Sequence, residues 1–374
     1  MHSILHVTPY YLPEDEYGGP VVTVSRLAEE QVRAGAQVCV FTTTTNKPNA
    51  GFEPTGVQVF RFRRWGEYGF FSPGLLWAFW HMAPKITAVH LHTWWNFTAF
   101  GIALLGKVRG VRMVVCPHGM LSPYSLSKSR MRIFFQKKVG QWLLGGAMLH
   151  ATSRQEAEEL VAVHPRIPIQ VVPNIVYLPA ELRPIAEKAP ADAFDLLFLS
   201  RVHPKKGLDL LLMALARMPD ECAWRLTVGG SSSDNYPEKM KKLAQNLGIA
   251  HRVYWHGWVD GDAKWPLLAE SDLLVLPSHN ENFAIVVLEA LAEGTPVVLS
   301  NQVGLHDYVR ENDFGWCCEP TAESLRETVR AAFADTAKRW RIRQVAPNAV
   351  RADFDPHTTV QAYFGLYNPG ATSR

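Results

Sequence analysis

Two glutamates eight residues apart, Glu281 and Glu289, form the sharpest chemical pattern in this sequence. They follow an apolar run at residues 272–277, and a second apolar run at 285–288 lies between them. On one helix, a rise of ~1.5 Å per residue would separate the carboxylates by ~12 Å, which suits a ligand with a hexose at one end and a ribose at the other. The helix N-terminus would offer free N–H groups to a diphosphate. Because an unpartnered glutamate on a buried helix is costly, we interpret the pair as a binding site and not as two surface carboxylates.

A second pattern, SRVHPKKGLD at 200–209, ends a predicted strand and enters a predicted helix. Its Arg201 and Lys206 can converge on a diphosphate through charge-assisted hydrogen bonds, although basic loop residues are usually only solvated.

A third pattern places Gly18 and Gly19 between the first predicted strand and the first helix. Paired glycines there allow close approach to a phosphate or form a plain turn. The segment lacks the G-x-G-x-x-G spacing, which argues against NAD.

Histidines follow two further predicted strands. His90 and His92 end one strand, and His118 follows the next in the sequence CPHGM. We interpret His90 as a core histidine with satisfied hydrogen bonds, and His118, which precedes a glycine at a strand end, as a site residue. The five cysteines have no paired spacing that would hold zinc. We therefore expect no metal and no tightly bound cofactor.

Charge is distributed unevenly along the chain. From Tyr68 to Gln155 there is no Asp or Glu, but there are ten Lys and Arg residues and many aromatics. The positive electrostatic potential of such a stretch attracts an anionic partner: a phospholipid surface, a lipid-diphosphate acceptor or nucleic acid. Residues 128–144 have the pattern of a basic amphipathic helix, either an interfacial helix or an ordinary surface helix. No nucleic-acid-binding motif is present, so we expect an anionic membrane surface and no nucleic acid. The surface would include Lys128, Arg130, Arg132, Lys137 and Lys138.

The fold that positions these candidate site residues can be predicted from the pattern of secondary structure. Short β-branched runs alternate with helical segments, which predicts parallel α/β sheets. The 374 residues, 47% hydrophobic and 20% charged, suffice for two globular domains. We predict a first domain at 1–175, a Pro-rich linker at 176–192, a second domain at 193–352, and a helical tail at 353–374 that packs back on the first domain. Both domains would be doubly wound, with ligands beyond the carboxyl ends of their strands. Strands are predicted at 3–8, 37–42, 57–62, 88–92, 112–116, 148–151 and 168–172, then at 195–200, 223–228, 252–256, 272–277, 296–300 and 315–318.

Taken together, the motifs resemble those of the retaining nucleotide-sugar glycosyltransferases of family 4. The resemblance is carried by LPSHNENFAIVVLEALAEGTPVV, LSRVHPKKGLDLLLMAL, GGP, HLHTWW and CPHGM, and it spans nearly the whole chain. It implies the GT-B fold, with two Rossmann-like domains facing across a cleft. The first domain would bind the acceptor and the second the sugar nucleotide. This sequence departs from the family at Ala284, where relatives commonly have glycine, and at Glu293, where they often have a small or sulfur-containing residue.

The resemblance also implies roles for individual residues. Arg201 and Lys206 would bind the donor diphosphate, Glu281 the hexose and Glu289 the ribose. His118 would lie near the donor sugar, and Arg201, Lys206, Glu281 and His118 would form the catalytic set. The remaining donor-binding residues would be Gly18, Gly19, Asn282, Phe283, Ala284 and Ile285.

The implied activity is metal-independent transfer of a hexose, with retention, from a UDP- or GDP-linked donor to a lipid-linked or polysaccharide-precursor acceptor. Such an enzyme would act in bacterial surface polysaccharide assembly, in the lipopolysaccharide or exopolysaccharide class. The absence of a signal-like start and of paired cysteines predicts a cytoplasmic protein, peripheral on the inner face of the membrane. Two alternatives stay open: a GT-B sugar-nucleotide 2-epimerase and a non-catalytic nucleotide-sugar-binding module.

Overall fold

A computed structural model describes residues 2–13, 19–45, 49–52, 55–66, 69–127, 129–179, 193–219, 221–232, 234–259 and 261–368. The chain forms two compact units. Unit 1 contains residues 1–177 and 354–374, and unit 2 contains residues 178–353. Gly18, Lys128 and most of the expected linker lie outside the described residues. Among those described, no helix has both the length and the apolar character needed to cross a bilayer.

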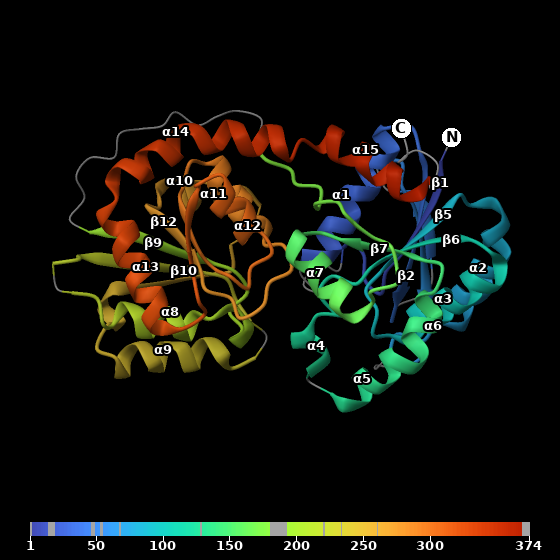
Figure 1. Ribbon diagram of the computed structural model, residues 1–374, viewed down its shortest axis with the longest axis horizontal. Coiled ribbons are helices and arrows are strands. Elements are labelled where there is room, and N and C mark those ends of the chain that lie inside the picture. Colours follow the sequence, from blue (N-terminus) through green and yellow to red (C-terminus); the bar gives the residue numbers. More distant parts are fainter. Residues whose placement is uncertain are drawn as a thin grey trace. The chain divides into compact units, whose positions relative to one another are not determined.

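Unit 1 is built on an eight-stranded sheet with the order β3-β4-β2-β1-β5-β6-β7-β8 (Figure 1). All neighbouring strands pair in parallel except β3, which is antiparallel to β4. The order reverses direction at β1, as in a doubly wound sheet. The strands are β1 (Ser3–Val7), β2 (Gln37–Thr44), β3 (Asn49–Phe52), β4 (Gln58–Arg63), β5 (Ala88–His92), β6 (Arg112–Cys116), β7 (Met148–Ala151) and β8 (Ile169–Val171).

Alternating strand residues divide the core of unit 1 into two layers. Leu5, Val89 and Val115 belong to the layer that includes residues of α2, α3, α6 and α7. Ile4, Ala88 and Val114 belong to the layer that includes residues of α1 and α15. This is the period-two pattern of a sheet covered on both faces. The helices of this unit are α1 (Gly19–Arg33), α2 (Pro73–Met82), α3 (Phe97–Arg109), α4 (Pro123–Ser127), α5 (Arg130–Phe135), α6 (Gln141–Leu144), α7 (Arg154–Val163) and α15 (Pro356–Tyr367), with a π-helical turn η3 (Gln136–Gly140) joining α5 to α6.

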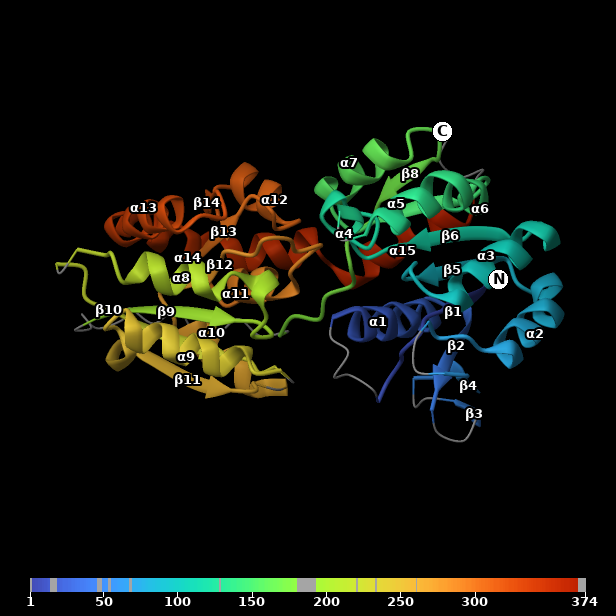
Figure 2. The ribbon, with the colours of Figure 1, turned by 90° about the horizontal axis from the view of Figure 1, so that it is seen from below.

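The last helix, α15, is part of unit 1. Tyr363, Leu366 and Tyr367 are buried in the layer that contains α1, and Arg112 donates to the carbonyl of Leu366 at 3.0 Å. Both views show α15 beside the β1–β6 region (Figures 1 and 2). The core of unit 1 is therefore made from both ends of the described chain.

Unit 2 contains a six-stranded, fully parallel sheet with the order β11-β10-β9-β12-β13-β14. Helices α8 and α9 lie on one side of its strands, and α10, α11 and α14 on the other (Figure 1). The strands are β9 (Phe194–Leu199), β10 (Trp224–Gly229), β11 (Val253–Gly257), β12 (Leu273–Leu276), β13 (Val297–Ser300) and β14 (Gly315–Cys318). The helices are α8 (Leu208–Leu215), α9 (Tyr236–Asn246), α10 (Lys264–Glu270), α11 (Ile285–Ala292), α12 (His306–Glu311), α13 (Ala322–Ala334) and α14 (Thr336–Asp353), with short 3-10 turns η4 (Pro204–Lys206), η5 (Ala250–Arg252) and η6 (Gly261–Ala263).

The predicted alternation of strands and helices is confirmed, with local differences. The helix expected to carry both Glu281 and Glu289 begins only at Ile285, so Glu289 lies about one turn into it and Glu281 lies outside it. The separation of ~12 Å, which assumed a single helix, therefore has no basis. The segment 128–144 is helical from Arg130 but includes the π-helical turn.

Candidate active site

Lys206 and Glu281 form an ion pair beyond the carboxyl ends of two adjacent strands of unit 2. Lys206 ends the turn η4 after β9, and Glu281 follows β12. Both side chains are mostly buried, with exposed fractions of 17% and 18%. Burial, and repulsion by Lys205 and Arg201, lower the pKa of Lys206 to about 7. The two sequence motifs therefore converge on one charged pair.

Two glycines allow the loops that carry these side chains to come together. Gly207 has φ of 71°, and a Cβ there would lie 2.2 Å from the carbonyl oxygen of Pro277. The Lys205 carbonyl next to it accepts from the N–H of His279 at 2.8 Å. Gly230 likewise leaves no room for a Cβ against the carbonyl of Ser200. Only glycine fits at these contacts, which hold the loops after β9, β10 and β12 together.

The backbone also holds Glu281 in place. Its N–H donates to the Gln302 carbonyl at 2.9 Å, and its own carbonyl accepts from the N–H of Gly304 at 2.8 Å. These bonds form a short parallel bridge with the loop after β13. The carboxylate is therefore presented from a fixed extended segment and not from a helix.

Ala284 has a left-handed backbone conformation, with φ of 69° and ψ of 71°, immediately before α11. This region costs an L-residue roughly 1–2 kcal/mol, a cost that glycine avoids. A glycine at this position, as in the family that the sequence resembles, would adopt this conformation without that cost. Of its neighbours, Phe283 is buried, whereas Asn282 and Ile285 are partly buried.

Glu289 is buried on α11 and pairs with Lys264 at the start of α10, at 2.6 Å between Oε1 and Nζ. The Lys264 ammonium also lies 4.5 Å from the ring centroid of Trp265. Sequence reasoning did not identify Lys264. Its signal was only indirect: a buried glutamate needs a cation, and no lysine or arginine precedes Glu289 within four residues.

Two polar atoms near Glu281 have no hydrogen-bond partner among the described residues. They are Oγ of Ser278 and Oδ1 of Asn280, both buried in the loop after β12. Buried polar atoms without partners are uncommon and point to a ligand or water. Arg201, after β9, is exposed and available to an anion.

In unit 1, His118 has φ of 49° and follows β6. Its Nε2 lies 3.2 Å from Nδ1 of His92, and its Nδ1 lies 3.7 Å from Sγ of Cys116. Glu156 fixes the adjoining loop by accepting from the N–H of Gly119 at 2.7 Å. Both ring nitrogens of His118 are therefore engaged inside unit 1. Gly19 begins α1, and a Cβ there would meet nothing within 4 Å in the described part of the chain.

Histidine and cysteine side chains gather below this loop. His6, His90 and His92 form one group whose potential ligand atoms lie within 4.8 Å of one another, and His92, Cys116 and His118 form a second. The residues come from separate strands, so their spacing in the sequence does not resemble that of a metal site.

Exposed aromatic and basic side chains occur on helical segments of unit 1 that contact one another in succession, α2, α3, α6, η3 and α5, and we call these side chains together the basic aromatic surface. Met131, Phe134 and Trp142 are 75%, 63% and 55% exposed. Arg109 lies over the ring of Trp80 at 4.4 Å. The surface comprises Trp77 and Trp80 of α2, Leu104, Lys107, Val108 and Arg109 of α3, Arg130, Met131, Arg132 and Phe134 of α5, Lys137, Lys138 and Val139 of η3, and Trp142 of α6.

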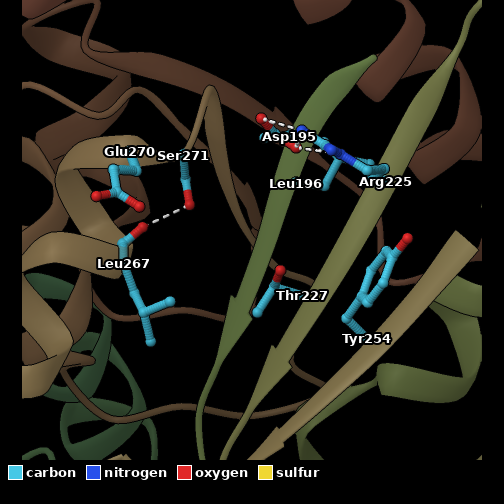
Figure 3. Close-up of a pocket in the computed structure, with 8 residues that line it drawn as sticks. All are labelled: Asp195, Leu196, Arg225, Thr227, Tyr254, Leu267, Glu270 and Ser271. Atoms are coloured by element: carbon cyan, nitrogen blue, oxygen red, sulfur yellow. Dashed lines mark hydrogen bonds and ion pairs between the residues drawn. The ribbon is translucent and has the colours of Figure 1, made fainter. Parts of the chain in front are cut away.

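A pocket of about 280 Å³ lies at the opposite end of the unit 2 sheet (Figure 3). It is lined by Asp195 and Arg225, near the amino ends of β9 and β10, which pair at 2.8 Å. None of the predicted site residues that the structure describes lines it. It is therefore distinct from the Lys206–Glu281 site.

Residues 182–349 match the family described as Glycosyl transferases group 1, and residues 18–175 match the Glycosyl transferase 4-like domain. A D-inositol 3-phosphate glycosyltransferase of Thermomonospora curvata is 31% identical over 83% of this chain and 81% of its own length. The lipopolysaccharide core biosynthesis glycosyltransferase LpsE of Rhizobium meliloti is 32% identical over 47% of this chain and 50% of its own. The Anabaena protein HepE, solved with UDP and glucose, superposes with a TM-score of 0.75 at 21% identity, covering 97% of this chain and 98% of its own. The predicted fold class, two Rossmann-like α/β domains of the GT-B type, is confirmed.

Proposed function

This chain belongs to the glycosyltransferases, with a Glycosyl transferase 4-like domain followed by a group 1 domain, and we propose that it transfers a hexose from a nucleoside diphosphate sugar with retention of the anomeric configuration. The donor is UDP- or GDP-linked. The single observation that supports this most is the buried pair of Lys206 and Glu281 at the carboxyl edge of the unit 2 sheet.

The pair supplies opposite charges that suit the two halves of such a donor. The Lys206 ammonium, with the exposed guanidinium of Arg201, binds the diphosphate through charge-assisted hydrogen bonds. The Glu281 carboxylate then accepts from hexose hydroxyl groups, and Glu289 accepts from the ribose. His118, Gly18 and Gly19 of unit 1 are assigned to the donor by family resemblance alone.

The transfer breaks the bond between the anomeric carbon and the diphosphate oxygen and forms a bond from that carbon to the acceptor oxygen. The acceptor hydroxyl attacks from the face that the diphosphate leaves, and the leaving phosphate oxygen takes its proton. Arg201 and Lys206 stabilise the charge that develops on the diphosphate, which is an electrostatic contribution to catalysis. We propose that these two side chains serve in place of a divalent metal.

A thermal-shift panel with UDP, GDP, ADP and dTDP, each with and without EDTA, identifies the donor base. A nucleotide at 100 times its dissociation constant stabilises the folded protein by ~2.7 kcal/mol, which a melting curve detects. A shift with UDP or GDP that EDTA leaves unchanged supports the proposal. A shift that requires a divalent metal would overturn metal independence.

Transfer itself is tested with the matching sugar nucleotide, purified variants and NMR of the product anomer. Lys206→Met and Glu281→Gln should each lower turnover by at least about a hundredfold, because each removes a charge that acts on the reacting donor. The matched control is Lys241→Met, which breaks an exposed ion pair with Glu238 of similar chemistry. An inverted product, or isomerisation of the donor without any acceptor, would contradict the proposal.

For the acceptor, we propose a lipid-linked glycan or polysaccharide precursor reached from an anionic membrane. The basic aromatic surface supports this, because exposed aromatic side chains enter the headgroup region while Lys and Arg attract anionic lipids. The similarity to the D-inositol 3-phosphate glycosyltransferase of Thermomonospora curvata favours a second candidate, a soluble phosphorylated polyol. Label transferred from the donor would partition into organic solvent in the first case and into water in the second.

A further inference from the structure

Four buried histidines project from one face of the unit 1 sheet, and a fifth, His118, adjoins them from the loop after β6. His6 of β1 is paired in register with His90 of β5, and His92 stands two residues further along. His150 of β7 contributes the fourth ring. His6, His90, His92 and His150 are each at most 2% exposed. The four strand histidines therefore belong to the buried interior of unit 1 and do not form a surface patch.

One part of the cluster leads from the loop after β6 to helix α1. His118 and His92 approach to 3.2 Å, and Nε2 of His92 lies 2.9 Å from Nδ1 of His6. The other ring nitrogen of His6 lies 2.7 Å from Oε1 of Gln31. At the opposite end, Cys116 is 3.7 Å from Nδ1 of His118.

The remaining part leads from α1 through the last helix to β8. Nε2 of Gln31 donates to the hydroxyl of Tyr367 at 2.9 Å, and that hydroxyl lies 2.9 Å from Nδ1 of His90. Nε2 of His90 lies 3.2 Å from Nδ1 of His150. Nε2 of His150 lies 2.8 Å from the carbonyl oxygen of Val172.

The carbonyl of Val172 determines which atoms carry protons. A carbonyl only accepts, so Nε2 of His150 carries the proton, and the Nδ1 of a neutral His150 accepts. His90 must then donate from Nε2 and accept at Nδ1, which requires Tyr367 to donate its hydroxyl proton. The Tyr367 oxygen in turn accepts from the amide of Gln31.

The same order continues without conflict to the other end. Oε1 of Gln31 accepts from Nε2 of His6, and His6 accepts at Nδ1 from Nε2 of His92. His92 accepts from Nε2 of His118, and His118 accepts from the thiol of Cys116. Reversing the order would set His150 and the Val172 carbonyl as two acceptors face to face. We call this chain of hydrogen bonds the histidine row; from donor to acceptor it contains Cys116, His118, His92, His6, Gln31, Tyr367, His90, His150 and the carbonyl of Val172.

We propose that the histidine row fixes His118 as the neutral Nε2–H tautomer and thereby positions it for sugar transfer, with Tyr367 of the last helix as the central link. Both ring nitrogens of His118 are bonded within the row, so the ring would serve in transfer as a fixed surface beside the donor sugar and not as a hydrogen-bond donor or acceptor to it. The role in transfer rests on the proposed function, whereas the proton order does not. Gln31, His6, His92, Tyr367, His90 and His150 are positioning residues, because each acts through its neighbour.

Burial keeps the rings neutral, as the row requires. It lowers the pKa of His6 and of His150 to about 4, and that of His118 to about 3. Burial, together with the neighbouring rings, lowers the pKa of His90 and His92 well below the usual range. Cys116, the first member of the row, has a pKa that is raised by burial and by Glu156. Tyr363 of α15, whose ring packs against His90 and His150, has a pKa that burial raises.

The direct test is ¹⁵N NMR of the histidine side chains in the wild-type full chain at pH 7.5. All five rings should be neutral and protonated at Nε2. A cationic ring, or His118 protonated at Nδ1, would overturn the proposal. So would a stoichiometric metal ion retained by the purified protein, detected by elemental analysis and lost on substitution of His92, which belongs to both groups of potential metal ligands.

The link through α15 is tested with Tyr367→Phe, which removes one hydroxyl and leaves the ring. The side-chain amide of Gln31 can then flip, because it no longer donates to a hydroxyl at position 367. A flipped amide would donate to His6 and reverse the hydrogen bonds through His92 to His118, so the His118 signal should become a mixture of tautomers. The matched control is Tyr363→Phe, one turn earlier on α15, whose ring also packs against His150 but whose hydroxyl is outside the row. The control should keep a single tautomer. An unchanged His118 signal in a folded Tyr367→Phe protein would refute the link.

Kinetics separate positioning from a merely structural role. Loss of the hydrogen bonds at Tyr367 should lower kcat by about tenfold while the KM for the donor stays within about twofold. Equal losses in both variants would indicate general destabilisation and would contradict the positioning role. A wild-type protein with the predicted tautomers but no transferase activity would refute the proposed function and leave the proton order intact.

Discussion

Nζ of Lys264 lies 2.6 Å from Oε1 of Glu289, and this contact joins the first residue of α10 to a buried carboxylate in α11. The pair orders the end of the unit 2 site that family resemblance assigns to the ribose. The contact uses Oε1 of Glu289, and we propose that Oε2 binds the ligand.

Replacing Lys264 by Met should leave Glu289 buried without a cation. We expect a loss of ~1–3 kcal/mol in the free energy of unfolding, and an increase of at least about fivefold in the dissociation constant of the bound nucleotide. Urea unfolding and calorimetric titration measure the two effects. Lys241→Met breaks an ion pair of 2.7 Å on the exposed face of α9 and should cost less than ~1 kcal/mol. Equal effects of the two substitutions would contradict a special role for Lys264.

Ala284→Gly should stabilise the protein by ~1 kcal/mol, because it removes the strain of a left-handed alanine. Chemical unfolding measures the gain. The opposite sign is expected for Ala331→Gly at an exposed interior position of α13, where glycine costs ~1 kcal/mol. A destabilised Ala284→Gly protein would show that the methyl group contributes packing that outweighs the strain.

The histidine row should make unit 1 sensitive to acid. The unfolded chain takes up protons on histidine near pH 6.5, whereas folded His6 and His150 resist until about pH 4. The unfolded state therefore binds more protons in this interval, so stability is complete above pH 6.5 and falls toward pH 4, by ~2 kcal/mol for each of these two rings at pH 5. Melting temperatures between pH 5 and pH 8 measure the slope. A flat profile would mean that the rings are not buried as neutral groups.

Lys206 should give donor binding an alkaline limit. Its pKa of about 7 means that the free protein loses the ammonium as the pH rises above neutrality, and with it part of its attraction for the diphosphate. UDP or GDP affinity, and kcat/KM, should fall above pH 7. Lys206→Arg retains the charge at all these pH values, so its weaker binding should be independent of pH. A wild-type profile that is equally flat to pH 9 would contradict the lowered pKa.

The basic aromatic surface should bind anionic vesicles. Each basic residue near such a surface contributes ~1 kcal/mol, so the double substitution Arg130→Gln and Lys137→Gln should weaken partitioning by about thirtyfold. Flotation with phosphatidylserine vesicles at low salt measures it, with phosphatidylcholine vesicles as the neutral reference. Lys239→Gln with Lys242→Gln, both exposed on α9 of unit 2, is the charge-matched control. Wild-type protein that stays in the unbound fraction would contradict the membrane proposal.

Most strands of the two sheets could be predicted, because parallel strands that are buried on both faces form short, continuous apolar runs in the sequence. Strand β3, at Asn49–Phe52, was missed because it is a short edge strand without β-branched residues. Helix α2 has no helical period that would predict it, because Pro73–Met82 is apolar on nearly every side. The helix α11 was expected to include Glu281 but begins at Ile285. The left-handed conformation of Ala284 could not be predicted, because alanine gives no sequence signal for it.

The proximity of Lys206 and Glu281 could be predicted only from their family roles, because they are 75 positions apart in the sequence. Lys264 and the histidine row were missed for the same reason. His90 was correctly interpreted as a buried histidine. However, its partners lie on other strands and on α15, and hydrogen bonds over such sequence distances have no local pattern.

The return of the chain to unit 1 has a consequence for biosynthesis. Tyr363 and Tyr367 belong to the core of unit 1, but they leave the ribosome after every residue of unit 2. Unit 2 can therefore complete its fold first. Until α15 has been synthesised, residues 1–177 lack the helix that completes one face of their sheet. A released chain that ends at residue 353 should consequently contain a protease-resistant unit 2 and a protease-sensitive unit 1.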